Sequence, residues 1–337
     1  MRKALPYILI VVVLIIAAGF YLDMNRPPGM SDRGLIERTP PPVQEFQDLG
    51  QAPEFTGINK WLNSDALTME GLKGKVVLID FWTYSCINCV RTLPHVTDWY
   101  EKYKDKGLVI VGVHTPEFAF EKETKNVETA LKRYDITYPV AMDNDYKTWQ
   151  AYSNRYWPAE YLVDQSGKIV YTHFGEGNYD TTENRIRTLL GMDQSIDTAP
   201  PSAPQAKSPE MYFGLSRLEF LSSGQKASSQ VSDYVIPNRL DLNRFALEGK
   251  WQFFDDKAVL VSGPGKIKLH FNAAKAHMVA SSAKTISVTA KTDDGAPVIV
   301  QIKDADLYTL FDGKAGDHVI EISIPDGGFE AFTFTFG

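Results

Sequence analysis

The sequence predicts an α/β domain followed by an all-β, sandwich-type domain with a jelly-roll-like arrangement, both behind one N-terminal transmembrane helix. An uncharged apolar run covers residues 4–22, strand and helix patterns alternate over 51–193, and period-2 patterns dominate 210–337. Strand–helix–strand order implies parallel strands joined by helical crossovers. Short alternating strands separated by Gly, Asp and Pro turns are typical of β-sandwiches.

The composition is that of a globular protein with a small acidic excess. The chain has 337 residues, 44% of them apolar, and a formal net charge of -7. These values exclude a largely disordered chain, and the acidic balance argues against a nucleic-acid partner. The two cysteines, Cys86 and Cys89, are too few for a disulfide-dense scaffold or a four-cysteine zinc site.

Residues 1–22 are predicted to cross the membrane. Arg2 and Lys3 precede the apolar run, and about 20 apolar residues span a bilayer as a helix. A signal peptide cut near Ala17–Gly19 is the alternative, but the run exceeds the usual apolar region of such peptides. The positive-inside rule keeps the amino terminus in the cytoplasm. We therefore expect a single-pass protein of the inner (cytoplasmic) membrane, with its domains in the periplasm or at the cell surface.

Two proline-rich segments separate the predicted domains. Residues 23–50 are expected to form a spacer, semi-rigid where prolines cluster. Residues 194–209 are rich in Pro, Ala and Ser and contain no large apolar run, so they predict a linker that cannot bury surface. The middle domain then covers 51–193 and the β-domain 210–337.

The elements of each domain follow from hydrophobic periodicity. In the middle domain we expect strands at 75–82, 108–113 and 138–142, a hairpin at 161–173, and helices at 89–104, 121–134 and 183–190. In the β-domain we expect strands at 267–272, 286–290, 298–302, 319–324 and 331–336.

The strongest chemical signal is the pair Cys86 and Cys89, which follows a buried strand and opens a helix. Cysteines at i and i+3 lie on one helix face at a separation that suits a disulfide. Free N–H groups and the helix dipole favour a thiolate at the first position, and the thiolate is the attacking species in disulfide exchange. The spacing supports a reactive Cys86 and a resolving Cys89.

Other interpretations of the pair are weaker. A metal site would need two more ligands, for which His95 and His114 are the candidates, without supporting spacing. A static disulfide suits an exported protein, but a bridge closing a four-residue loop constrains the unfolded chain very little.

The stretch from Leu78 to His95 (LIDFWTYSCINCVRTLPH), with 114–121, 138–146 and 155–159, resembles the thioredoxin superfamily in its membrane-anchored TlpA/ResA-type branch. It is similar in particular to the thioredoxin-like module of DipZ-type proteins. Residues 208–214 and 332–337 resemble the carbohydrate-binding-module-like domain that follows the module in those proteins. The resemblance implies a thioredoxin fold for 51–193.

The resemblance also implies roles for single residues. Asp80 stands where thioredoxins have a buried aspartate, whose raised pKa lets it exchange a proton with Cys89. Trp157–Pro158 stands where the superfamily has a cis-proline facing the disulfide, with backbone free to pair with a substrate chain. Trp82 is expected to border the disulfide, and with Trp157 and Pro158 to contact substrate. Glu160, which could titrate with the cysteines or face solvent, is not assigned.

These expectations describe an extracytoplasmic thiol:disulfide oxidoreductase with protein thiols and disulfides as substrates and no cofactor beyond the Cys86–Cys89 disulfide. The uncharged Ile87–Asn88 between the cysteines favours a reductant or isomerase. Electrons would come from a membrane carrier of the CcdA/DsbD-like type, and the resemblance makes cytochrome c maturation a candidate role.

Two other functions stay open at this point. A thiol peroxidase of the AhpC-like kind is one, although Trp82–Cys86 lacks the expected Pro-Thr-Cys pattern. The other is a tethered glycan-binding or cell-wall-binding protein with a vestigial redox module. Trp251, Phe253 and Phe254 are its candidate sugar-stacking residues, although aromatic residues at strand spacing more often belong to a core.

Overall fold

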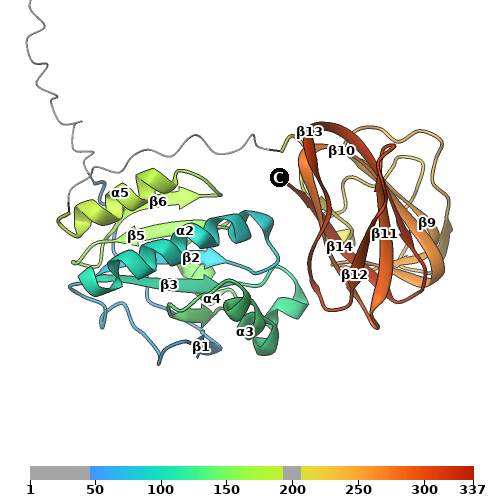
Figure 1. The fold of residues 1–337 in the computed structure, drawn as a ribbon. Coiled ribbons are helices and arrows are strands. Elements are labelled where there is room, and N and C mark those ends of the chain that lie inside the picture. The colour runs from blue at the N-terminus through green and yellow to red at the C-terminus, as the bar shows by residue number, and fades with distance from the viewer. Residues whose placement is uncertain (1–45, 193–205) are drawn as a thin grey trace, which may run out of the picture. The chain divides into compact units, whose positions relative to one another are not determined.

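The computed structural model describes residues 46–192 and 206–337 (Figure 1). The predicted anchor at 1–22, most of the spacer at 23–50 and most of the linker at 194–209 lie outside the described residues. Within the described ranges, no helix combines the length and the apolar character needed to cross a membrane.

The first domain is built on a six-stranded mixed sheet. Its strands lie in the order β1-β4-β3-β2-β5-β6. β2, β3 and β4 are parallel, whereas β5 and β6 continue the sheet as an antiparallel hairpin. The strands are β1 (Lys60–Leu62), β2 (Val76–Trp82), β3 (Leu108–His114), β4 (Val140–Met142), β5 (Ala159–Val163) and β6 (Ile169–Phe174). This is the thioredoxin-like α/β arrangement that the sequence predicted.

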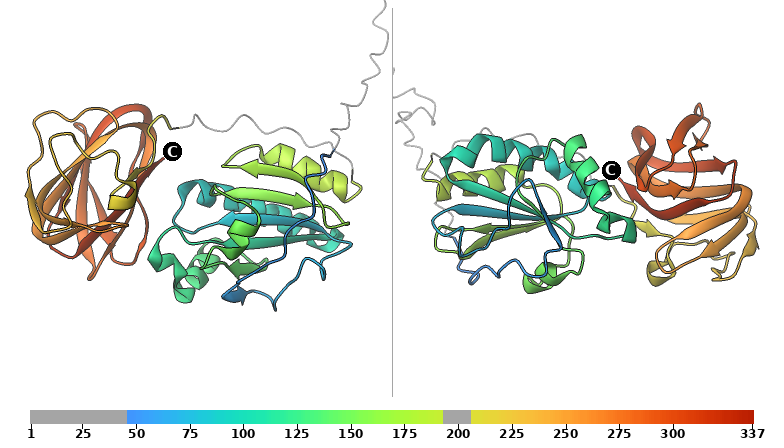
Figure 2. Two further views of the ribbon diagram at one scale, coloured as in Figure 1. Left: turned by 180° about the vertical axis from the view of Figure 1, so that it is seen from behind. Right: turned by 90° about the horizontal axis from the view of Figure 1, so that it is seen from below.

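Helices cover both faces of this sheet. α2 (Ile87–Tyr103), α3 (Thr124–Arg133) and α5 (Tyr179–Leu189) pack into the apolar cluster on one face. The short α4 (Lys147–Ala151) and the segment around Met69 and Leu72 pack on the other. Figures 1 and 2 show α2 and α5 together on the first face. Every residue of β2 is buried, as the continuous apolar run at 75–82 predicted.

Two helices differ from their predicted extents by more than two residues. The helix expected at 121–134 is divided into a short 3₁₀ helix, η2 (Ala119–Lys122), and α3. It divides because Glu123 takes an extended conformation (φ -75°, ψ 114°) and the Glu121 side chain bonds the backbone N–H groups of Glu117 and Phe118. α5 begins at Tyr179, four residues before the predicted start at 183.

The second domain is rich in β-sheet, and its longest strand, β10 (Ala258–Ser282), organises it. Residues 266–270 of β10 lie between β9 (Arg244–Phe253) and β13 (Asp306–Ile324), whereas residues 276–280 lie between β14 (Phe329–Phe336) and β13. The remaining strands are β7 (Met211–Tyr212), β8 (Ser232–Tyr234), β11 (Ile286–Thr292) and β12 (Val298–Ile302). All five strand segments predicted for this domain fall within these strands.

The core of the second domain follows from period-2 alternation. Ile267, Leu269 and Phe271 of β10 have no exposed area, whereas the residues between them are partly exposed. Successive side chains of a strand point to opposite faces of its sheet, so one face of β10 is core.

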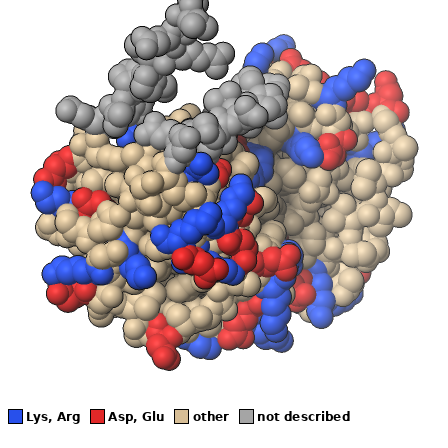
Figure 3. Space-filling view, turned by 60° about the vertical axis from the view of Figure 1, so that its left-hand side comes forward, with Lys and Arg blue, Asp and Glu red and all other residues tan. Residues whose placement is uncertain are grey.

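On the molecular face shown in Figure 3, acidic and basic side chains are mixed rather than separated into large areas of one sign.

Candidate active site

The two cysteines lie at the start of α2 with different accessibility. Cys86 is the N-cap residue of α2, and its carbonyl accepts the Val90 N–H at 2.9 Å. Cys86 is 8% exposed, whereas Cys89, one turn further along, has no exposed area. Burial raises the pKa of the Cys89 thiol, with further contributions from Cys86 and Asp80. The free N–H groups of a helix start stabilise negative charge, and Cys86 lies at that end of α2. Both thiols are free.

The peptide bond between Trp157 and Pro158 is cis, as predicted. The Trp157 carbonyl oxygen lies 3.9 Å from the Cys86 Sγ atom. The Trp157 indole is half-buried; its Nε1–H donates to the Thr115 carbonyl at 3.0 Å, and its ring lies 4.2 Å from that of Trp149. The backbone before Pro158 thus borders the more accessible thiol.

Asp80 lies on β2 beneath α2. Its side chain is 1% exposed, and burial raises the pKa of its carboxyl to about 7. Desolvation disfavours the charged form of a carboxyl. A carboxyl with this pKa can take up and return a proton near neutral pH.

Trp82 lies two residues beyond Asp80 and packs in the same apolar cluster as both cysteines. It has no exposed area, so its indole is part of the core beneath the cysteines and does not form a surface for substrate, contrary to our expectation. Its ring meets His114 edge-on at 5.1 Å.

Gly112 makes room for this packing. A Cβ atom at Gly112 would lie 2.9 Å from Trp82 Nε1 and 2.9 Å from Tyr138 Cε2, closer than packed atoms tolerate. His114, two residues later on β3, is fully buried, and burial lowers its pKa to about 3. The imidazole is therefore neutral at physiological pH.

Sequence reasoning missed a buried polar contact behind the cysteine loop. The Ser85 hydroxyl donates to the Glu121 carboxylate at 2.5 Å, and the other carboxylate oxygen accepts the Phe118 N–H at 2.9 Å. Both side chains are buried, and burial raises the pKa of Glu121 to about 7. A glutamate in a predicted helix gives no sequence signal for this role, because its partner is 36 residues away.

Glu160 is buried, not solvent-facing. It is 1% exposed, and its Oε2 accepts the Thr182 hydroxyl at 3.0 Å. Burial and the charge of Asp80 raise its pKa to about 8. The sequence did not show whether Glu160 titrates with the cysteines or faces solvent, because its burial depends on α5 covering β5.

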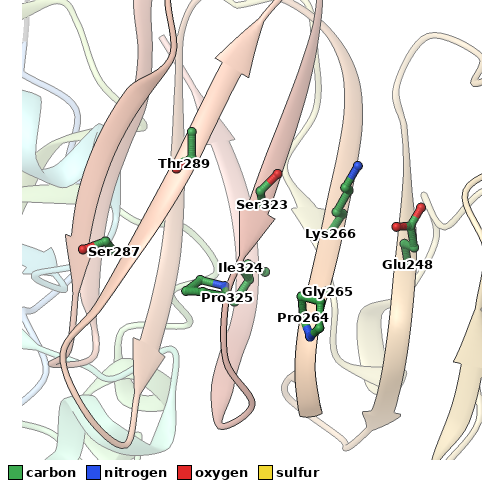
Figure 4. A pocket seen from close by; sticks show the side chains of 9 residues that line it. All are labelled: Glu248, Pro264, Gly265, Lys266, Ser287, Thr289, Ser323, Ile324 and Pro325. Carbon is green, nitrogen blue, oxygen red and sulfur yellow. The ribbon is translucent and has the colours of Figure 1, made fainter.

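Two of the three candidate sugar-stacking aromatics of the second domain belong to its core. Trp251 and Phe253 are 0% and 1% exposed, whereas Phe254 is 40% exposed. The same domain has a shallow hollow of about 220 Å³. Figure 4 shows the side chains of Glu248, Lys266, Ser287, Thr289 and Ser323 around it, together with Ile324, prolines and a glycine.

In residues 46–192 and 206–337, no three His, Cys, Asp or Glu side chains are grouped as metal ligands would be. His95 and His114 do not join the cysteines: His95 stacks on Tyr179 at 3.6 Å, and His114 packs against Trp82.

Comparison with known proteins covers both domains. Residues 49–190 match the Redoxin family, and residues 208–337 match the family described as thioredoxin like C-terminal domain. Over 308 residues the chain is 40% identical to Protein DipZ of Mycobacterium tuberculosis, covering 87% of this chain and 44% of DipZ. The chain thus spans less than half the length of that relative.

Two shorter relatives are covered over most of their length. The thiol-disulfide oxidoreductase YkuV of Bacillus subtilis is 31% identical over 138 residues, which are 41% of this chain and 93% of YkuV. The thiol-disulfide oxidoreductase ResA of Bacillus cereus is 30% identical over 139 residues, which are 41% of this chain and 76% of ResA. With the thioredoxin-like sheet and the cysteine pair at the start of α2, these matches show that the chain belongs to the thioredoxin-like family of thiol-disulfide oxidoreductases.

Proposed function

We propose that this protein is an extracytoplasmic thiol:disulfide oxidoreductase in which Cys86 attacks protein disulfides and Cys89 resolves the product. The observation that carries the proposal is the asymmetry of the pair. Cys86, at a helix start, is 8% exposed and has its Sγ 3.9 Å from the Trp157 carbonyl, whereas Cys89 has no exposed area. A substrate therefore meets Cys86 first.

The reaction has two exchange steps. The Cys86 thiolate attacks one sulfur of a substrate disulfide; a mixed disulfide forms, and the other substrate sulfur leaves as a thiolate. Cys89 then gives up its proton, and its sulfur attacks Cys86 Sγ. The Cys86–Cys89 bond forms, the bond to substrate breaks, and the second substrate sulfur leaves as a thiolate. The two cysteines lose two electrons, and the substrate gains them.

Three other residues support these steps. Asp80 accepts the Cys89 proton, because its carboxyl titrates near neutral pH. The backbone at Trp157 and Pro158 pairs with an extended substrate chain next to Cys86. This position suits a substrate backbone because the Trp157 carbonyl already lies beside the attacking sulfur.

A Cys89→Ser variant tests the mechanism. Expressed in cells, it should hold substrates on Cys86 as mixed disulfides that mass spectrometry identifies, and Cys86→Ser should hold none. Purified wild-type protein should reduce insulin disulfides without consuming peroxide. Peroxide consumption without insulin reduction would instead indicate the thiol peroxidase. A folded, exported Cys89→Ser variant with no Cys86-linked protein would refute the exchange mechanism.

We propose further that the protein works as a reductant or isomerase at the outer side of the cytoplasmic membrane, with residues 1–22 as its anchor. Each reduction consumes two electrons, and the chain has no other cysteine to replace them. A membrane carrier of the CcdA/DsbD-like type is the proposed donor, and apocytochrome c thiols are candidate substrates. If cells that lack such a carrier also lack the reduced form of Cys86, the carrier is supported as the electron donor. An unchanged reduced fraction of Cys86 would contradict this proposal.

A polar glycan or cell-wall ligand is the proposed partner of the second domain. The hollow around Glu248 and Lys266 offers hydroxyl and charged groups to such a ligand. Binding on a glycan array that is lost on Ser287→Trp and Ser323→Trp would locate the ligand there. Equal binding by the variants would place it elsewhere.

A further inference from the structure

Three titratable side chains form a row across the sheet beneath α2 and α5. Asp80 of β2 lies directly opposite Glu160 of β5, and Glu160 lies directly opposite His173 of β6. Residues directly opposite in antiparallel strands project from the same face, with Cβ atoms about 5 Å apart. The row begins under Cys89 and ends at His173, which is partly exposed.

Each member of the row has a buried polar atom without a hydrogen-bond partner. These atoms are Asp80 Oδ1, Glu160 Oε1 and His173 Nε2. A buried polar atom without a partner is costly, and two adjacent carboxylates cannot both ionise without strong repulsion. The two carboxyls do not hydrogen-bond each other, but one proton held by either of them removes one of two neighbouring charges and with it most of the repulsion.

We propose that Asp80 and Glu160 form a coupled carboxyl pair that holds one proton, and that Glu160 is a second positioning residue for the Cys89 proton. The inference rests on the proposed exchange reaction and deepens it. When Cys89 attacks Cys86, its S–H bond breaks and the proton goes to the Asp80 carboxylate. Before this step the pair holds one proton, on Glu160. The Asp80 carboxylate is therefore unprotonated and free to accept the proton of Cys89.

The groups packed around the pair are consistent with this role. α2 contributes Cys89, and the segment before β4 contributes Tyr138, whose hydroxyl has no partner. α5 contributes the Thr182 hydroxyl, which donates to Glu160 at 3.0 Å. The Arg185 guanidinium lies over the Tyr171 ring, 4.6 Å from its centroid. Burial lowers the pKa of His173, so the imidazole is neutral near pH 7 and leaves the pair's charge uncompensated.

Infrared spectroscopy of the full chain, labelled with 13C-glutamate, tests the pairing without requiring activity. Burial also raises the pKa of Glu121, so the Glu160 band is identified as the one that Glu160→Gln removes from the spectrum. As the pH rises, the protonated Asp80 band of reduced protein should disappear first and this Glu160 band second. In Asp80→Asn the upper midpoint should fall by about one pH unit, because the neighbouring charge is gone. An unchanged glutamate midpoint would show two independent carboxyls and overturn the proposal.

Kinetics test the connection to Cys89. With excess glutathione disulfide, so that resolution limits the rate, disulfide formation in wild-type protein should accelerate in two steps with pH. Glu160→Gln should lose the upper step and keep the lower one. Identical profiles for wild type and Glu160→Gln would overturn the proposal. Glu210→Gln is the matched control: burial also raises the pKa of Glu210, but it belongs to the second domain, so both steps should remain.

A second variant keeps the proposal testable if Glu160→Gln does not fold. Thr182→Val keeps the volume but removes the hydroxyl that lowers the pKa of Glu160, so the upper step should move to higher pH. An unchanged upper step would count against the pair. Absence of thiol exchange in wild-type protein would refute the proposed function alone, because the infrared titration would still report whether the two carboxyls interact.

Discussion

Ser85 and Glu121 join the loop before α2 to the segment after β3 through a buried hydrogen bond of 2.5 Å. Ser85 immediately precedes Cys86, so this bond fixes the backbone from which the attacking thiol projects. Glu121 is held in turn by the N–H of Phe118 at 2.9 Å. The position of Cys86 therefore depends on a carboxylate far away in the sequence.

Replacing Ser85 by Ala should lower the free energy of unfolding of the first domain by about 1–2 kcal/mol, because a buried acceptor loses a charge-assisted donor. Guanidinium unfolding, followed by tryptophan fluorescence, measures the change. Ser223→Ala, at an exposed position, should leave stability within about 0.5 kcal/mol. Equal stabilities for the two variants would mean that the Ser85 bond contributes nothing.

Asp80→Asn should stabilise the folded protein increasingly as the pH rises. The pKa of Asp80 is about 7 in the folded state and about 3.9 in an unfolded chain, so the folded state binds the extra proton. Asp80 therefore lowers the stability of wild-type protein by up to about 4 kcal/mol between pH 4 and 7. The variant lacks this contribution, while Glu121 and Glu160 titrate in both proteins. Unfolding titrations of both proteins at pH 4, 6 and 8 measure this difference. A constant difference across the three pH values would contradict the raised pKa.

The titration of His114 should change stability with pH in the opposite direction to that of Asp80. Its pKa is about 3 in the folded protein and about 6.5 in an unfolded chain, so here the unfolded state binds the extra proton. Stability should fall as the pH drops from 6.5 toward 3. Between pH 6.5 and 5 wild-type protein should lose about 2 kcal/mol more than His114→Gln. Parallel stability curves for the two proteins would show that His114 does not titrate in this way.

Gly112→Ala should destabilise the first domain by about 1–3 kcal/mol, because the added methyl group overpacks a core. Trp82 and Tyr138 would both have to move, since each lies 2.9 Å from the new atom. Gly224→Ala is the control, with its nearest contact at 3.9 Å. Thermal unfolding should separate the two variants, and a fully stable Gly112→Ala would mean that the two rings can shift freely.

The parts of the site that depend on local spacing could be predicted from the sequence. Cys86 and Cys89 reveal themselves by their separation and by the strand before them, and the apolar run around Asp80 predicts its burial. The parts that depend on the register between paired strands could not be predicted from the sequence. Glu160 lies opposite Asp80 only because β5 pairs antiparallel with β2, 80 residues further along the chain. Nothing local predicts that pairing.

Burial on both faces of the sheet explains why Trp82 does not contact substrate as we expected. Trp82 was expected to reach the substrate because it stands near the cysteines, but β2 is covered by helices on one side and by the α4 segment on the other. Every side chain of such a strand is interior. A run of apolar residues shows that a strand is buried, but not how deeply its last residue lies.

The unequal exposure of the two sulfur atoms has one more consequence. With 8% of Cys86 and none of Cys89 exposed, a small alkylating agent should label a single position of the reduced protein. A client bound through Cys86 would be released by Cys89, a sulfur atom that solvent does not reach. The time that each client stays attached would then depend in part on how fast this buried sulfur loses its proton.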